Sequence, residues 1–233
     1  MYTMNRIFFA LALGVLATAP SAFSAAFSVG DVFASIGGGI VEVRSQNGTF
    51  VATLNTTLGG YTTGSTFDQA GNFYVTGFSS NVVSKFDSTG TLVNSNWAGG
   101  IAFNESIVFN AAGDAYIGNA GSNSVRKVNS SGTTLFDYTG MGSNTDWIDL
   151  ASDQTTLFYS DESGTIRRWD LVSNTPLSNF AVAGDSFYAK RVRPNGDLMA
   201  AAGSGNVYRY NSASVFAGVG HLRWPVVRTR RAW

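Results

Sequence analysis

Two carboxylates and three neighbouring residues at a repeated spacing are the side chains best suited to chemistry in this sequence. Glu105, Trp147 and Tyr188 follow one another at intervals of 42 and 41 residues. Asp149 and Lys190 lie two residues after Trp147 and Tyr188. Carboxylate oxygens are hard ligands, so Glu105 and Asp149 together could hold a cation such as Ca²⁺. In the simpler interpretation they are solvated polar groups, because isolated acids are usually exposed.

Few other side chains in the sequence are suited to catalysis. The only histidine is His221, close to the C-terminal end, and the chain has no cysteine. A Ser-His-Asp triad and an imidazole-based metal site are therefore excluded from the rest of the chain. Cysteine nucleophiles and zinc clusters of cysteines are excluded throughout. The sequence thus favours a binding or surface-interaction module without evident catalytic machinery over an enzyme.

Basic residues cluster next to Tyr188, and two interpretations remain open for them. Lys190, Arg191 and Arg193 could bind an anionic sugar or a phosphate group. Charges on a strand edge also protect a sheet against aggregation, which explains the cluster equally well. Across the whole chain 15 basic residues balance 15 acidic ones, so no global field favours nucleic acid or an anionic membrane. We expect a protein or glycan as the partner.

The spacing of these candidate residues belongs to a longer internal repeat. Residues 71–92 and 113–135 are similar in sequence, and both Gly71 and Gly113 and Gly90 and Gly132 are 42 residues apart. Further segments upstream and downstream fall on the same grid, which gives five units between residue 30 and about residue 215. A fixed period of this length is typical of repeat architectures.

Each unit contains four short stretches that favour β-strands. In one unit they cover residues 106–109, 115–118, 124–128 and 133–138, separated by turn signals rich in Gly, Asn and Ser. Four strands in 40 to 45 residues are the pattern of a propeller blade. Such a small sheet buries both faces only when it stacks against its neighbours. The sequence therefore predicts an all-β, incomplete β-propeller of about five four-stranded blades.

One column of large apolar residues recurs in the second strand of the units. It consists of Tyr74, Tyr116, Phe158 and Met199. Aromatic residues in a row could form a stacking platform for sugars or bases. Apolar positions at repeat spacing usually mark buried packing, so we expect this column to fill the space between blades.

The pattern resembles the NHL, YVTN and virginiamycin-B-lyase-like group of propellers. Residues 71–92 match their Gly-Asn-x-Tyr-Val, Asn-x-Val-x-Lys-Phe-Asp and Gly-Thr-Leu elements almost throughout. The resemblance implies architecture and leaves activity open, because such folds serve many functions. The lyases of the group depend on a histidine pair that has no match here. Calcium-dependent lactonase-type propellers ligate metal near the inner strands, and residues 104–106 resemble their entrance glutamate. This implies the alternative of a Ca²⁺-assisted hydrolase or lyase using Glu105 and Asp149.

The N-terminal 26 residues have the composition of a secretory signal peptide. Arg6 ends a short polar start, residues 7–16 are apolar, and residues 17–26 are rich in small side chains. The apolar run is shorter than the roughly 20 residues needed to span a membrane. We expect export to the periplasm or the extracellular space, and no membrane span once residues 1–26 are removed.

The blade region is predicted to cover residues 27–219, and both of its ends depart from the pattern. The first unit begins with a second strand at Gly30, so its inner strand is missing. Residues 220–233 are basic and carry no blade motif, which indicates either a functional tail or a truncated or frame-shifted end. Open sheet edges would expose unpaired backbone groups and permit self-association. A truncated fragment without a function of its own is the third alternative.

Overall fold

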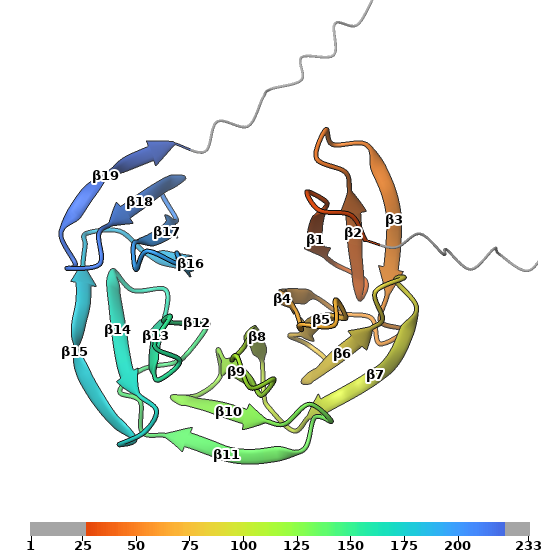
Figure 1. Ribbon diagram of the computed structural model, residues 1–233, viewed down its shortest axis with the longest axis horizontal. Helices are drawn as coiled ribbons and strands as arrows, with labels where there is room; N and C mark the ends of the chain where they lie inside the picture. Colours follow the sequence, from red (N-terminus) through yellow and green to blue (C-terminus); the bar gives the residue numbers. More distant parts are fainter. Residues whose placement is uncertain (1–26, 222–233) are drawn as a thin grey trace, which may run out of the picture.

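The computed structural model describes residues 27–221, which form nineteen β-strands in five antiparallel sheets (Figure 1). Within this range there is no α-helix, and hence no helix that could cross a membrane. The predicted signal peptide, residues 1–26, lies outside the described residues, as do residues 222–233. The last strand ends at His221, two residues beyond the expected end of the blade region.

The sheets follow the chain order. The first sheet contains β1 (Val32–Ile36), β2 (Ile40–Arg44) and β3 (Phe50–Asn55). The second contains β4 (Thr62–Phe67), β5 (Phe73–Gly77), β6 (Val82–Phe86) and β7 (Leu92–Gly99). The third contains β8 (Asn104–Phe109), β9 (Ala115–Asn119), β10 (Ser124–Val128) and β11 (Thr134–Thr139). The fourth contains β12 (Trp147–Leu150), β13 (Thr156–Ser160), β14 (Thr165–Asp170) and β15 (Thr175–Val182). The fifth contains β16 (Phe187–Val192), β17 (Leu198–Ala202), β18 (Asn206–Tyr210) and β19 (Phe216–His221).

The five sheets are the blades of a β-propeller arranged as an open arc. In each of the last four sheets the first strand lies innermost, and β4, β8, β12 and β16 contact one another in that order. Figure 1 shows the first and fifth sheets, orange and blue, on either side of an opening in the ring. The first sheet has three strands, and β1 corresponds to the second strand of the others. The predicted fold class and repeat number are confirmed.

Glycine recurs at one position of the repeat because the turn there requires a left-handed backbone conformation. Gly71, Gly113 and Gly196 precede the second strand of their sheets with φ angles of 80°, 87° and 82°. Glycine reaches such angles without steric penalty, because it has no Cβ atom. In the fourth sheet Gln154 takes this conformation with a φ of 63°, so the turn is kept where the glycine is lost.

The core lies between the sheets. Tyr74 packs against the third sheet, Tyr116 against the fourth and Phe158 against the fifth, and each is at least nine-tenths buried. The expectation that this column fills the space between blades is therefore confirmed for three positions. Met199 occupies the fourth, on the face of the fifth sheet that no other sheet covers, and it is partly exposed.

Candidate functional site

The inner strands begin at one end of the propeller axis, which we call the entrance end. At this end, irregular pairing between strands changes the direction in which side chains point. The register between first and second strands shifts after Asn104 in β8 and after Phe187 in β16. Glu105 and Tyr188 are the extra residues at these two bulges. Pairing in β12 is regular, with Trp147 opposite Ser160. Bulges re-aim side chains, so equivalent sequence positions do not point the same way in different sheets.

Lys190 is buried between the fourth and fifth sheets with 2% of its surface exposed. Its Nζ donates hydrogen bonds to Ser160 Oγ at 2.8 Å and to the main-chain oxygen of Trp147. In return, Trp147 Nε1 donates to the main-chain oxygen of Lys190 at 2.8 Å. Burial lowers the pKa of Lys190 to about 7, although Asp149 and Asp146 act in the opposite direction. The side-chain amino group of Lys190 thus joins two blades, and its hydrogen bonds are made within the protein.

Asp149 joins the same pair of inner strands. Its Oδ2 accepts from Val192 N at 2.7 Å, and its Oδ1 accepts from Leu150 N at 2.9 Å. Arg191 Nη1 lies 3.7 Å from Oδ1, and its guanidinium stands 5.8 Å from the ring centre of Trp147. Burial raises the pKa of Asp149, while the Val192 N–H and the charge of Arg191 oppose this. The structure therefore brings Trp147, Asp149 and Lys190 together.

Glu105 belongs to a different group of side chains. Burial raises the pKa of its carboxyl to about 7, and the negative charges of Asp146 and Glu162 add to this effect. The pKa of Asp146 is raised to about 6 by burial and by the charges of Glu162 and Asp161, with Lys190 opposing. We call Glu105, Asp146 and Glu162 the entrance acid cluster. Like charges in a poorly hydrated place favour protonation, and a bound positive charge would relieve this repulsion.

One member of this cluster and one residue next to it have buried polar atoms without a hydrogen-bond partner. They are Asn104, at both amide atoms, and Asp146, at Oδ1. Asn104 lies opposite Asn119 in the sheet, and Asn119 N donates to Thr145 Oγ1 at 3.0 Å, so β8 and β12 begin side by side. An unpartnered buried polar group is costly and calls for water, an ion or a ligand to satisfy it.

The predicted metal pair is not assembled into a larger ligand set. Within residues 27–221 no group of three or more histidine, aspartate or glutamate side chains lies close enough to hold one metal ion. The charged groups that act on Glu105 are Asp146 and Glu162. Those that act on Asp149 are Arg191 and Lys190. The two carboxylates of the calcium hypothesis therefore work in separate surroundings.

Aromatic side chains lie exposed at the entrance end. Tyr188 is 50% exposed, and Phe103 is 47% exposed with its ring centre 5.1 Å from that of Phe78. Phe103 has a φ of 53°, which is unusual for a bulky residue, and its N–H donates to Asn81 Oδ1 at 2.8 Å. Strain of this kind persists where the surroundings hold it, and it is frequent at binding sites. Phe103 directly precedes Asn104 and Glu105.

Sequence reasoning missed Asp146, Glu162 and Phe103. A step of 42 residues aligns Trp147 with Glu105. The two side chains nevertheless differ in direction, because β8 contains a bulge at Glu105 and β12 contains none, while the repeat length is the same. Glu162 lies in the turn between β13 and β14, with a φ of 61°. The repeat could have identified Asp146, since this residue lies 42 residues after Asn104 and directly precedes Trp147.

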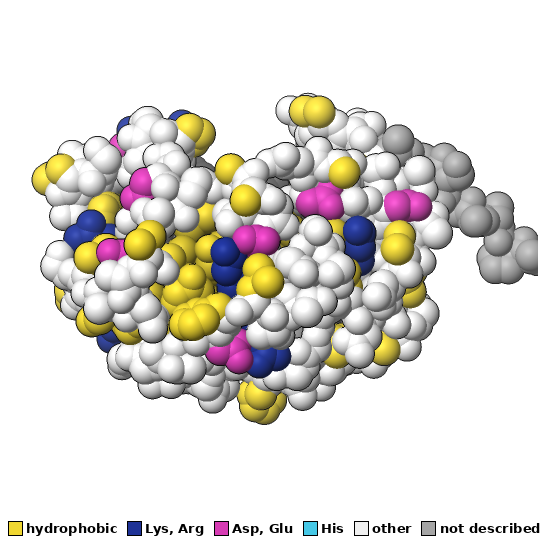
Figure 2. Space-filling model, turned by 60° about the horizontal axis from the view of Figure 1, so that its bottom comes forward, with side chains coloured by type: hydrophobic (Ala, Val, Ile, Leu, Met, Phe, Trp, Pro, Cys, Tyr) yellow, Lys and Arg dark blue, Asp and Glu magenta, His cyan; other side chains and the backbone are white. Residues whose placement is uncertain are grey.

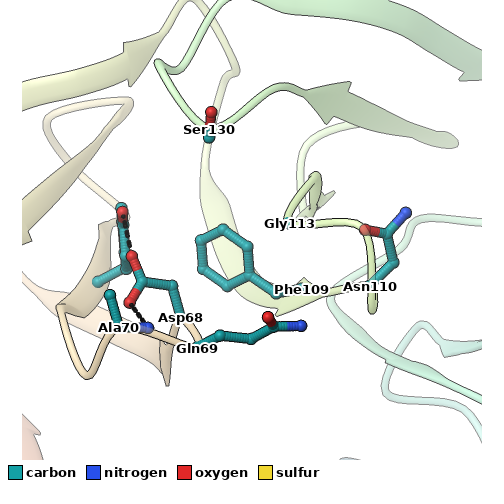
Figure 3. Close-up of a pocket in the computed structure, with 8 residues that line it drawn as sticks. Asp68, Gln69, Ala70, Phe109, Asn110, Gly113 and Ser130 are labelled. Carbon is teal, nitrogen blue, oxygen red and sulfur yellow. Dashed lines mark hydrogen bonds between the residues drawn. The ribbon is translucent and has the colours of Figure 1, made fainter.

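The opposite end of the axis carries a cavity of about 190 Å³ between the second and third sheets (Figure 3). Figure 3 shows the ring of Phe109 facing Asp68 across this space. Asp68 Oδ2 accepts from Tyr74 Oη at 3.0 Å, and Gln69 Nε2 donates to Ala111 O at 2.9 Å. These polar groups are engaged within the protein, so the entrance end is the stronger candidate.

The surface charges are distributed in opposite-sign neighbours. Figure 2 shows Lys and Arg side chains beside Asp and Glu on the face it presents, rather than a wide area of one sign. Ion pairs at the rim, such as Arg126 with Asp137 at 2.7 Å, have the same character. The members of the entrance acid cluster make no such pair within residues 27–221.

These observations define the chain as a β-propeller with an acidic, aromatic-bordered entrance end. No protein-family model matches the chain, and no curated protein matches its sequence. Among solved structures it is similar to the crystal structure of the computationally designed Ika8 protein, with a TM-score of 0.56 and 17% sequence identity. The match covers 80% of this chain and spans 57% of the length of the designed protein. At this identity the similarity establishes the fold alone.

Proposed function

We propose that this protein is an exported, non-catalytic binding module that holds a partner at the entrance end of the propeller. The observation that carries the proposal is the entrance acid cluster, in which burial and mutual repulsion raise the pKa values of Glu105 and Asp146 to about 7 and about 6. Propellers of the NHL and YVTN type, which residues 71–92 resemble, use one scaffold for many binding tasks.

The chemistry of the cluster favours a ligand that presents a positive charge. A protonated amine placed between Glu105 and Asp146 would offset their repulsion and satisfy the unpartnered Asp146 Oδ1. Exposed aromatic rings such as Phe103 provide the flat, weakly negative faces on which cations bind. A lysine-bearing protein or an amino-bearing glycan has both features.

Tetralysine and its fully Nε-acetylated form are suitable probes. We expect calorimetry at pH 7.5 and low salt to detect tetralysine and not the acetylated peptide, and Glu105→Gln to weaken binding about tenfold, the value of one charged hydrogen bond. Asp137→Asn, which removes a rim carboxylate paired with Arg126, is the matched control and should leave binding unchanged. Equal binding of both peptides, or equal affinity of Glu105→Gln, would overturn the proposal.

The calcium alternative has its own test. It requires Glu105 and Asp149 to share one ion, whereas both Asp149 oxygens accept hydrogen bonds from main-chain N–H groups. This engagement leads us to prefer the binding module. Micromolar Ca²⁺ binding that disappears in Glu105→Ala would favour the hydrolase or lyase, and no heat on Ca²⁺ titration would end that alternative.

Export is tested on the mature protein. If residues 1–26 are a signal peptide, expression in a bacterial host should give a product beginning at Ala25 or Phe27, because small side chains precede both positions. Phe27 itself packs against the first sheet, with its ring centre 4.8 Å from that of Phe33. Mass spectrometry of the product distinguishes these starts from an uncleaved chain.

A further inference from the structure

The inner edge of β1 is the one place in the described fold where a second strand lacks a first. The strands β5, β9, β13 and β17 are each paired on both edges. Their counterpart β1 is paired with β2 alone. Such an edge exposes unpaired N–H and C=O groups that can template another strand.

A buried hydroxyl on β1 has lost the partner that its counterpart has. Thr76 in β5 donates from Oγ1 to Gly64 O at 3.0 Å, which is a carbonyl of its own inner strand. Ser35, 41 residues earlier, holds the same position in β1, and its Oγ is buried without a partner. The complete second sheet therefore shows what the first sheet lacks, namely a carbonyl from an inner strand.

The groups available for pairing can be assigned. Ile36 N donates to Thr62 Oγ1 at 3.1 Å, and the same hydroxyl donates to Ile40 O of β2 at 2.7 Å, so the main chain of Ile36 faces β2. Because successive residues of a strand present these groups to opposite edges, Val32 and Ala34 also face β2, and Phe33 and Ser35 present theirs to the free edge. The side chains of Val32 and Ile36 are 55% and 39% exposed.

The close packing between neighbouring inner strands limits the size of the side chain that an added strand can place against β4. A Cβ atom on Gly64 would lie 2.6 Å from Ser106 Cα and against the Glu105 carbonyl, so β4 and β8 approach closely. Ser106, 42 residues after Gly64, holds the same position in the next inner strand. A strand added to β1 would meet β4 at this position, so it needs Gly or Ser there. Both β4 and β8 end in phenylalanine.

We propose that the free edge of β1 binds an extended segment of a different protein, which adds a fourth, antiparallel strand to the first sheet. The segment has a small residue, Gly or Ser, facing β4 and an apolar residue at its end, as the inner strands of this chain have. Residues 222–233 of the chain, among them four arginines, contain no stretch of this kind. The surface continues the series of inner-strand contacts from β16 to β4, and it is independent of the entrance acid cluster.

The probe is a capped peptide with the sequence of residues 103–110, which include β8. We expect it to bind the protein, to slow hydrogen exchange at the amides of Phe33 and Ser35, and to lose at least tenfold in affinity when its Ser106 counterpart is replaced by Trp. Ser35→Ala in the protein should weaken binding severalfold, because the buried hydroxyl then offers no hydrogen bond. A peptide N-methylated on the paired edge should not bind, and this control leaves the protein unaltered.

Three results would overturn the proposal. One is absence of binding, or equal binding of the Trp-substituted and parent peptides. Another is slow exchange at Ser35 before any peptide is added and at low protein concentration, which would show that residues 222–233 already occupy the edge. The third is a concentration-dependent dimer, seen by light scattering and dissociated by the peptide, which would identify a second copy as the occupant.

Discussion

At the scale of the residue, Lys190 makes stability depend on pH. Its pKa is lowered from 10.5 to about 7 in the folded protein, so between these values the unfolded chain binds a proton that the folded chain does not. Stability therefore rises as the pH increases through this window, by at most about 1.4 kcal/mol per unit. We predict that urea unfolding at pH 7 and pH 9 shows this rise in the protein and not in Lys190→Met.

Lys85→Met is the matched control, since Lys85 stands over the ring of Tyr74 rather than between two inner strands. It should keep the rise of stability with pH. Lys190→Met also leaves Ser160 Oγ without its donor, so its absolute stability is no guide, and the comparison concerns the slope alone. The same slope in Lys190→Met and in the unaltered protein would contradict the assignment.

The candidate site could be predicted from the sequence only where side chains follow the repeat. Trp147, Asp149 and Lys190 meet across β12 and β16 because their spacing of about one unit places them on adjacent inner strands. The environment of Glu105 could not be predicted, because a bulge moves its side chain by one position while the repeat length stays the same. Bulges depend on local pairing, which has no sequence signal here.

At the scale of the element, the sequence determines strand order well and edge pairing poorly. Residues 115–118 and 124–128 were expected as strands, and β9 (Ala115–Asn119) and β10 (Ser124–Val128) match them to within one residue. Period-two alternation of apolar residues and glycine turns with a left-handed backbone are local signals, so they can be recognised in a single sequence. What covers the inner edge of β1 is a tertiary question that no local signal answers.

The repeated aromatic column allows a matched comparison between a covered and an uncovered sheet face. Phe158→Ala removes a side chain packed between the fourth and fifth sheets, and we expect about 3 to 5 kcal/mol of destabilisation, as for other buried phenylalanines. Met199→Ala changes the same position on the uncovered face and should cost below about 1 kcal/mol. Urea unfolding of both variants measures this difference.

A similar loss in both variants would show that something covers the face of the fifth sheet in solution. Phe158 touches Phe180 with ring centres 5.1 Å apart, whereas Met199 lines an open cavity of about 170 Å³ beside Trp147. The comparison therefore reports directly on whether the arc has a neighbour at this end.

At the scale of the whole molecule, an open arc of blades should not unfold as uniformly as a closed ring. Each sheet contacts only its neighbours, so an end sheet gains one interface where a central sheet gains two. The first sheet also has three strands and an unpaired inner edge, while every residue of β9 in the third sheet is buried. The first sheet should therefore open at a lower free energy than the third.

We predict that amide hydrogen exchange is slowest in β9 and at least tenfold faster in β1 and β2. The tenfold ratio corresponds to about 1.4 kcal/mol between local openings. Exchange measured by NMR or by mass spectrometry after proteolysis resolves these strands. Equal protection of all five sheets would mean that the ring unfolds as one unit and that its opening is closed in solution. Selective slowing of β1 and β2 by the inner-strand peptide would instead locate the weakest part of the molecule at the edge that we propose is a binding surface.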